Sequence, residues 1–129
     1  MKRAGILNAA LSGALARLGH TDELLICDSG MPLPRGVEAV DLAFLPGVPS
    51  FAEVLDGILS ELVVEAATAA QEVRTANAGC DALLSARLPG LTYVPHEELK
   101  RLSHSSRLVV RTGEAQPYAN VLLRCGVAF

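Results

Sequence analysis

The sequence of 129 residues has no tryptophan, two tyrosines and three phenylalanines, so aromatic residues make up only 4% of it. Half of its residues are nevertheless apolar, and the core must therefore be built from Leu, Val, Ala and Ile. This length and apolar content suit one domain over residues 1–129. The mean hydropathy of +0.35 is high for a small soluble monomer, which predicts an interface between subunits. A tightly packed, alanine-rich monomer is the alternative.

The chain also lacks any run of Lys or Arg, and its net charge is −3. A nucleic-acid-binding domain needs a basic patch, so we expect no nucleic-acid partner. No window reaches the ~18 consecutive apolar residues of a membrane span, so we expect no membrane partner.

The N-terminus partly resembles a signal peptide, since Lys2 and Arg3 precede an apolar stretch over 6–16 that ends in Ala-Leu-Ala. Polar residues and a glycine interrupt that stretch, and its apolar positions follow one face of a helix. Cleavage would also remove the helix that leads to His20. We therefore predict a cytoplasmic protein.

Several chemical motifs are missing. The three cysteines include no C-x-x-C pair, and Cys27 and Cys125 lie in apolar stretches, which is typical of buried thiols in a reducing compartment. There is no G-x-G-x-x-G, no Walker loop and no G-x-S-x-G. His96-Glu97 could begin H-E-x-x-H, but Lys100 stands where the second histidine is required. We predict neither a metal site nor a cofactor.

Helical and strand patterns alternate along most of the chain. Apolar residues recur at helical spacing over 6–18, with Gly19 as the expected stop, and Ser50-Phe51-Ala52-Glu53 is a capping box that should begin another helix. Further helices are expected over 76–87 and from Pro95 onward. The expected strands are 24–27, 38–44, 63–70, 91–94, 108–111 and 121–124.

This alternation predicts an α/β fold, namely a single three-layer domain with a largely parallel mixed sheet flanked by helices. The last two strands are joined only by residues 112–120, which is short for a helical crossover. One strand can therefore run antiparallel to the others.

Candidate functional residues lie at the ends of these elements. His20 follows the first helix, Asp28 ends a buried strand, His96 begins a helix, and Tyr118-Ala119-Asn120 leads into the last strand. The carboxyl ends of strands are where sites gather in such sheets. Position alone also allows structural roles: a histidine that complements the helix dipole, an Asx turn, a surface residue and turn chemistry.

Taken together, these segments resemble the D-ribose pyranase family, within the wider group of ribose pyranases and fucose mutarotases. The resemblance covers the chain from end to end. The segments that carry it are K-x-x-G-I-L-N (2–8), R-L-G-H-T-D (17–22), C-D-S-G-M-P-L-P (27–34), G-V-P-S-F (47–51), V-E-A-A (64–67), H-E (96–97), T-G-E-x-x-P-Y-A-N (112–120) and C-G-V-A-F (125–129).

The resemblance implies an isomerase that interconverts the pyranose and furanose forms of free ribose, in a ring-shaped homo-oligomer, commonly a decamer of two pentamers. It assigns the role of proton donor to His20. It assigns substrate binding to the remaining candidates, namely Asp28, His96, Tyr118, Ala119 and Asn120.

The chemistry needs no cofactor, because ring opening only places a proton on the ring oxygen and removes one from the anomeric hydroxyl. One well-placed acid or base contributes roughly 10²–10⁴ in rate. Asp28, His96 or a bound water could accept the anomeric proton. Fucose-specific relatives resemble Y-G-N at the sugar loop, whereas this chain has Ala119. A mutarotase for another sugar such as L-fucose, a non-catalytic sugar-binding subunit of a transport system and a ring-forming scaffold remain alternatives.

Overall fold

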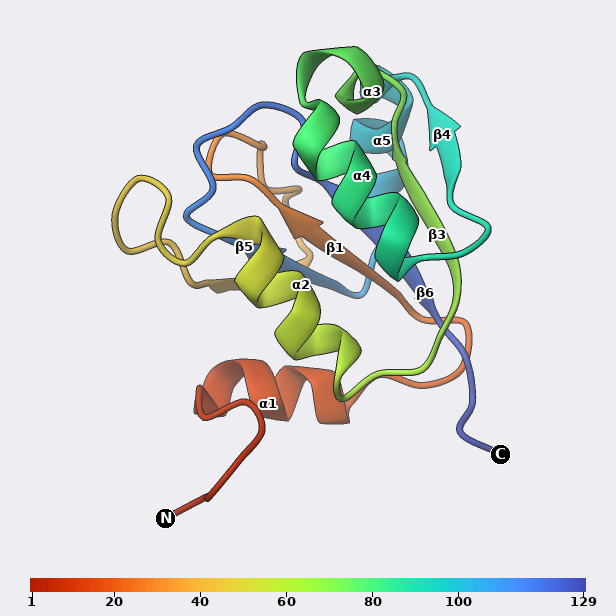
Figure 1. Ribbon diagram of the computed structural model, residues 1–129. Helices are drawn as coiled ribbons and strands as arrows, with labels where there is room; N and C mark the ends of the chain where they lie inside the picture. Colours follow the sequence, from red (N-terminus) through yellow and green to blue (C-terminus); the bar gives the residue numbers. More distant parts are fainter.

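The computed structural model describes residues 1–129. Six strands form one sheet in the order β2-β5-β1-β6-β3-β4, with helices on both of its faces (Figure 1). None of the helices has the length and apolar character needed to cross a membrane. In chain order the elements are α1 (Ala9–Ala16), β1 (Glu23–Cys27), β2 (Glu38–Asp41), α2 (Phe51–Leu59), β3 (Val64–Ala70), α3 (Val73–Ala76), α4 (Ala78–Arg87), β4 (Thr92–Val94), α5 (His96–Ser103), β5 (Leu108–Arg111) and β6 (Val121–Cys125).

The sheet is mixed and largely parallel, as predicted. Strand β5 pairs in parallel with both β1 and β2, and β3 pairs in parallel with β4. Strand β6 lies between β1 and β3 and runs antiparallel to both. The short 112–120 link between β5 and β6 is therefore explained by the one strand that runs the other way.

The core has two halves, one on each face of the sheet. Leu24 and Ile26 face a larger cluster formed with α1, α2 and α4, whereas Leu25 and Cys27 face a smaller cluster that includes Leu99 of α5. Because β1 is buried on both faces, its sequence is a continuous apolar run rather than an alternating one. The predicted three-layer arrangement is confirmed.

The capping box at the start of α2 is present as predicted. The Ser50 hydroxyl accepts the backbone N–H of Glu53 at 3.1 Å, and the Glu53 carboxylate accepts the backbone N–H of Ser50 at 2.8 Å. The first helix is shorter than its apolar stripe, because the Asn8 side chain accepts the Leu11 N–H at 2.9 Å and starts α1 at Ala9. The helix also ends at Ala16, before the expected stop at Gly19.

Two further elements differ from the sequence prediction. Strand β2 ends at Asp41, and the chain then forms a loop instead of continuing to residue 44. The helix expected over 76–87 is split at Asn77, whose backbone is extended (φ −149°) and whose side chain accepts the Cys80 N–H at 3.2 Å. The short helix α3 before this break was not predicted. Asn77 also donates to the Pro117 carbonyl at 2.9 Å, which ties the break to the loop before β6.

The three cysteines are buried and unpaired. The expectation that Cys27 and Cys125 are small buried residues is therefore confirmed. Burial raises the pKa of the Cys27 thiol to about 12, so this group is not a nucleophile at neutral pH.

Candidate functional site

A pocket of about 240 Å³ lies at the carboxyl end of β1. Its walls come from the loop after β1, the start of α5 and the loop before β6. The lining residues are Asp28, Gly30, Met31, Pro32, His96, Lys100, Pro117 and Tyr118. The fold thus brings together three of the side chains predicted from sequence, although they are spread over 90 residues of the chain.

Asp28 and Asn120 form a reciprocal hydrogen-bonded pair. The Asp28 backbone N–H donates to Asn120 Oδ1 at 2.9 Å, and Asn120 Nδ2 donates to Asp28 Oδ2 at 3.1 Å. The Gly30 N–H donates to the other carboxylate oxygen at 3.0 Å. Burial raises the pKa of Asp28, while the bonds from Gly30 and Asn120 oppose that rise. The result is a carboxylate held in one orientation at the pocket wall.

His96 and Tyr118 meet edge to face, with ring centroids 5.0 Å apart and an interplanar angle of 82°. His96 Nδ1 is buried and has no hydrogen-bond partner. A buried polar atom without a partner is costly, and such an atom in a native protein often marks a functional position. The backbone N–H of His96 donates to the Glu72 carboxylate at 2.9 and 3.2 Å, which caps α5 where Pro95 offers no side-chain acceptor.

The loop before β6 is tightly constrained. Tyr118 has a φ of +56°, and its carbonyl accepts the Asn120 N–H at 2.9 Å. A left-handed conformation at a non-glycine residue costs roughly 1–3 kcal/mol and is often found at functional sites. Ala119 and Asn120 are fully buried. Ala119 packs into the core behind the pocket, and Asn120 reaches the site through Asp28.

His20 lies at the opposite end of β1 from this pocket. It belongs to a turn over residues 19–22, and its Nε2 is 3.0 Å from Glu65 Oε2. Its side chain is about half exposed, at 52%. The five residues of β1 lie between His20 and Asp28 and extend about 16 Å. Within one chain, therefore, the predicted proton donor and the predicted sugar-binding residues do not meet.

Two charged side chains at or next to the pocket were not predicted as site residues. Lys100 lines the pocket and donates to Glu97 at 2.9 Å. Its spacing of four residues from His96 places it on the same face of α5, so the sequence did hold a signal for it. Glu72 lies between β3 and α3, and no sequence pattern indicated that its carboxylate would cap α5. No group of three or more His, Cys, Asp or Glu side chains is placed to hold a metal ion.

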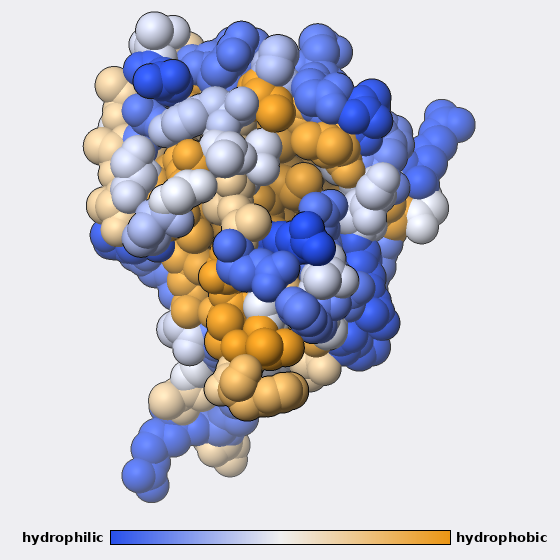
Figure 2. All heavy atoms as spheres, turned by 90° about the vertical axis from the view of Figure 1, so that its right-hand side faces the viewer, coloured by the Kyte–Doolittle hydropathy of each residue, from blue (hydrophilic) through white to orange (hydrophobic).

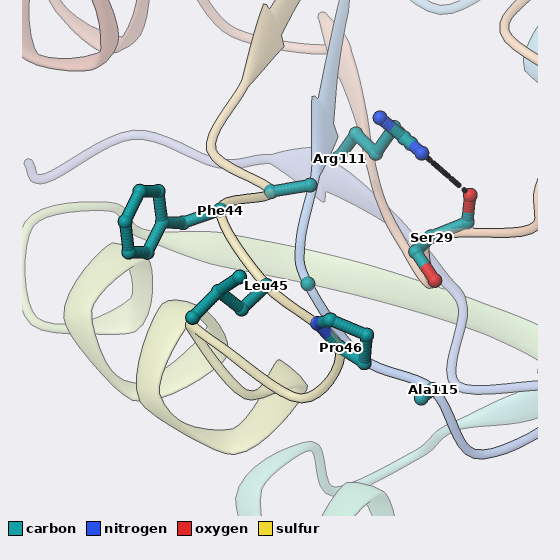
Figure 3. A pocket seen from close by; sticks show the side chains of 8 residues that line it. Ser29, Phe44, Leu45, Pro46, Arg111 and Ala115 are labelled. Carbon is teal, nitrogen blue, oxygen red and sulfur yellow. Dashed lines mark hydrogen bonds between the residues drawn. The ribbon is translucent and has the colours of Figure 1, made fainter.

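A larger pocket of about 470 Å³ is lined by Ser29, residues 43–46, Arg111, Gly113 and Ala115 (Figure 3). Its one charged side chain, Arg111, is already engaged by the Ser29 carbonyl at 2.9 and 3.1 Å and by Asp41 at 2.8 Å. Phe44 extends outward and is 79% exposed. The smaller pocket, which Asp28 and His96 line, is therefore the candidate functional site.

Known proteins resemble this chain over its whole length. The model of the RbsD / FucU transport protein family matches residues 1–128. A D-ribose pyranase of Streptomyces avermitilis is 70% identical over 129 residues, with all of both chains covered. The structure of Bacillus subtilis RbsD complexed with D-ribose has a TM-score of 0.95 at 41% identity, again with both chains fully covered. The fucose mutarotase of Streptococcus pneumoniae, at 20% identity and a TM-score of 0.80, shares the fold.

Proposed function

The chain belongs to the RbsD / FucU transport protein family, and we propose on this premise that it is an isomerase that interconverts the pyranose and furanose forms of free D-ribose. The observation that carries the proposal is the pocket at the end of β1, where Asp28, His96 and Tyr118 converge. It is supported by the 70% identical relative named as a D-ribose pyranase and by the closely similar structure that holds D-ribose.

The pocket offers the groups that sugar hydroxyls bind best. The Asp28 carboxylate is an acceptor for charge-assisted hydrogen bonds, and the imidazole of His96 is a second polar group that lines the pocket. Asn120 does not line the pocket but fixes the carboxylate in place. We assign ribose binding to Asp28, His96 and Tyr118, with Ala119 and Asn120 as the buried support of that wall.

Asp28 is the group best suited to accept the anomeric proton. Its carboxylate is partly buried and fixed by two hydrogen bonds, and burial raises its pKa, which makes it a stronger base than an exposed aspartate. A proton delivered to the ring oxygen then opens the ring. Closure through the 4-hydroxyl instead of the 5-hydroxyl converts the pyranose into the furanose.

The proton donor of this scheme, His20, has to come from a second copy of the chain, because β1 separates it from Asp28. A ring of subunits, such as a decamer, would place His20 of one copy at the pocket of its neighbour. Exposed apolar residues support such contacts. Phe44, Leu45 and Val48 lie on the loop after β2, and Val63 and Phe129 lie just before β3 and at the C-terminus. Figure 2 shows apolar side chains gathered on the side of β3, β4 and the C-terminus.

In the cell, we place this reaction in the cytoplasm, where the family resemblance implies that it supplies the ring form of ribose that a kinase accepts after uptake. L-Fucose is the substrate of a relative that shares only the fold at 20% identity, so no observation on this chain favours it.

Magnetisation-transfer NMR of D-ribose tests the proposed function directly. With enzyme in neutral buffer, pyranose–furanose exchange should become faster than in buffer alone, and L-fucose exchange should change less. The His20→Ala protein should retain its fold and assembly and lose the acceleration. If a folded, oligomeric wild-type protein accelerates neither sugar, the catalytic function is wrong and a sugar-binding role remains.

A further inference from the structure

The turn that carries His20 is held more firmly than its exposed position requires. Asp22 Oδ2 accepts the Gly19 N–H at 2.7 Å and the Arg107 guanidinium at 2.6 Å. These two bonds lower the pKa of Asp22 and keep it ionised. Thr21 donates its N–H to the Cys125 carbonyl at 2.9 Å and adopts a φ of +70°. Strain at a β-branched residue persists only where the surroundings fix it, and it often marks a functional position.

Glu65 reaches this turn from a bulge in β3. Val64 pairs with Cys125 of β6 and Ala66 pairs with Arg124, so Glu65 is an extra residue without a partner of its own in the ladder. Bulges turn a side chain out of the regular alternation and occur often beside active sites. Here the bulge directs Glu65 to His20, and the Glu65 Oε2 to His20 Nε2 distance is 3.0 Å.

The second oxygen of Glu65 is held as well. Arg124 Nε lies 3.1 Å from Glu65 Oε1. One carboxylate therefore connects a histidine on one side with a guanidinium on the other. Exposed ion pairs add little to stability, and the side chains of His20 and Glu65 are 52% and 37% exposed. Stability alone does not account for the strained turn, the bulge and the doubly held carboxylate together.

We propose that Glu65 is a positioning residue for His20: in the protonated imidazolium ring it accepts the Nε2–H, while Nδ1–H delivers its proton to the sugar and leaves the neutral Nε2–H tautomer. A carboxylate that holds one ring nitrogen of a histidine fixes both the tautomer and the orientation of the ring. No hydrogen bond within the chain engages His20 Nδ1, so this nitrogen is free for a substrate. The proposal rests on the proposed function, in which His20 of one copy acts at the pocket of the next.

Kinetics of Glu65 variants test this role. Glu65→Ala should lower kcat for ribose exchange about 10-fold, which is the effect of a misplaced acid, with KM within about twofold of wild type. Glu65→Gln keeps an oxygen acceptor for the Nε2–H, so it should recover part of the loss. Glu38→Gln is the matched control, because Glu38 is also an exposed strand glutamate paired with an arginine, Arg17. Unchanged kcat in both Glu65 variants, or a loss confined to KM, would overturn the proposal.

Nitrogen-15 NMR of the His20 ring gives a second readout that needs no activity. In the neutral ring of the wild type and of Glu38→Gln, the proton should sit on Nε2, and Glu65→Ala should move part of it to Nδ1. Identical ring spectra in all three proteins would also overturn the proposal. If the wild type fails to accelerate ribose exchange, the proposed function fails, while the ring spectra still decide whether Glu65 orients His20.

Discussion

At the scale of single residues, the proposed role of Asp28 depends most on its hydrogen-bonded pair with Asn120. Asn120 is fully buried and uses both ends of its amide on Asp28. Asn120→Ala would leave the Asp28 N–H and one carboxylate oxygen without their partner, at a cost of about 1–3 kcal/mol in the free energy of unfolding. We expect a matching loss of ribose affinity, measured by titration.

Asn8→Ala is the control for that substitution. It removes the N-cap of α1, which accepts the Leu11 N–H far from the pocket, so it should also lower the free energy of unfolding, by about 1 kcal/mol. Ribose affinity should not change. Equal affinity losses in the two variants would mean that Asn120 acts only through stability.

Asp28 should also set an acid limit to the reaction. Because burial raises its pKa above 3.8, this carboxyl takes up its proton at a higher pH than an ordinary aspartate. A protonated Asp28 cannot accept the anomeric proton, so acidification should lower the exchange rate already at a pH above the range in which an ordinary aspartate titrates. An exchange rate that stays constant on this acidification in folded protein would show that another group is the base.

The raised pKa of Asp28 affects the free energy of unfolding in the opposite direction: acidification lowers activity but increases stability at this group. The folded-state pKa is the higher one, so the folded protein binds this proton more tightly than the unfolded chain does. The ionised carboxyl therefore lowers stability at neutral pH, and acidification through this window favours folding at this group. The loss of activity on acidification should thus occur without any unfolding caused by protonation of Asp28.

At the scale of elements, the loop after β2 is fixed against Gly113. The Gly113 N–H donates to the Pro49 carbonyl at 2.9 Å, and Gly47 donates to the Gly113 carbonyl at 2.6 Å. A Cβ at Gly113 would overlap the Val48 carbonyl and lie 2.8 Å from the Leu45 oxygen. Gly113→Ala should therefore lower the free energy of unfolding by about 1–3 kcal/mol, measured by urea denaturation at equal protein concentration.

Gly57→Ala provides the control within a helix. Nothing lies within 4 Å of a Cβ built at Gly57 in α2, and alanine favours a helix over glycine by about 1 kcal/mol. This variant should be at least as stable as wild type. A Gly113→Ala protein of equal stability would show that the loop can shift away from β5 at no cost.

Sequence patterns predicted the elements whose signals are local. The capping box at Ser50 and the apolar run over 24–27 both act through neighbouring residues, and both are present in the structure. The early end of β2 depends on a tertiary contact, namely the packing of the 42–49 loop on Gly113. The break at Asn77 combines a local cap on the Cys80 N–H with the distant bond to Pro117. Such contacts leave no periodicity to detect.

The residues of the candidate site also divide into those that the sequence predicted and those that it did not. Asp28, His96 and Tyr118 were predicted, and the fold gathers them because each lies at an element end on one edge of the sheet. Glu72 and Glu65 were missed, since a distant cap and a bulged strand residue have no signature in the sequence.

At the scale of the whole molecule, the separation of His20 from Asp28 is the most consequential feature. Because the proposed proton donor and the proposed base lie at opposite ends of one strand, both can act on one sugar only when two copies meet. The exposed apolar residues near each end, Phe44 and Val63 among them, provide surfaces for such contacts. The proposed catalytic unit is therefore the oligomer and not the single chain.

Mixing two inactive variants tests this claim most directly. His20→Ala and Asp28→Asn chains carrying different tags are co-expressed, and assemblies that contain both are purified and assayed by ribose magnetisation transfer. Each variant alone should show only the exchange of buffer. In mixed rings, about a quarter of the shared sites would combine an intact His20 with an intact Asp28, and activity should return to about that fraction of wild type. Mixed assemblies as inactive as their parents would contradict a site shared between two copies.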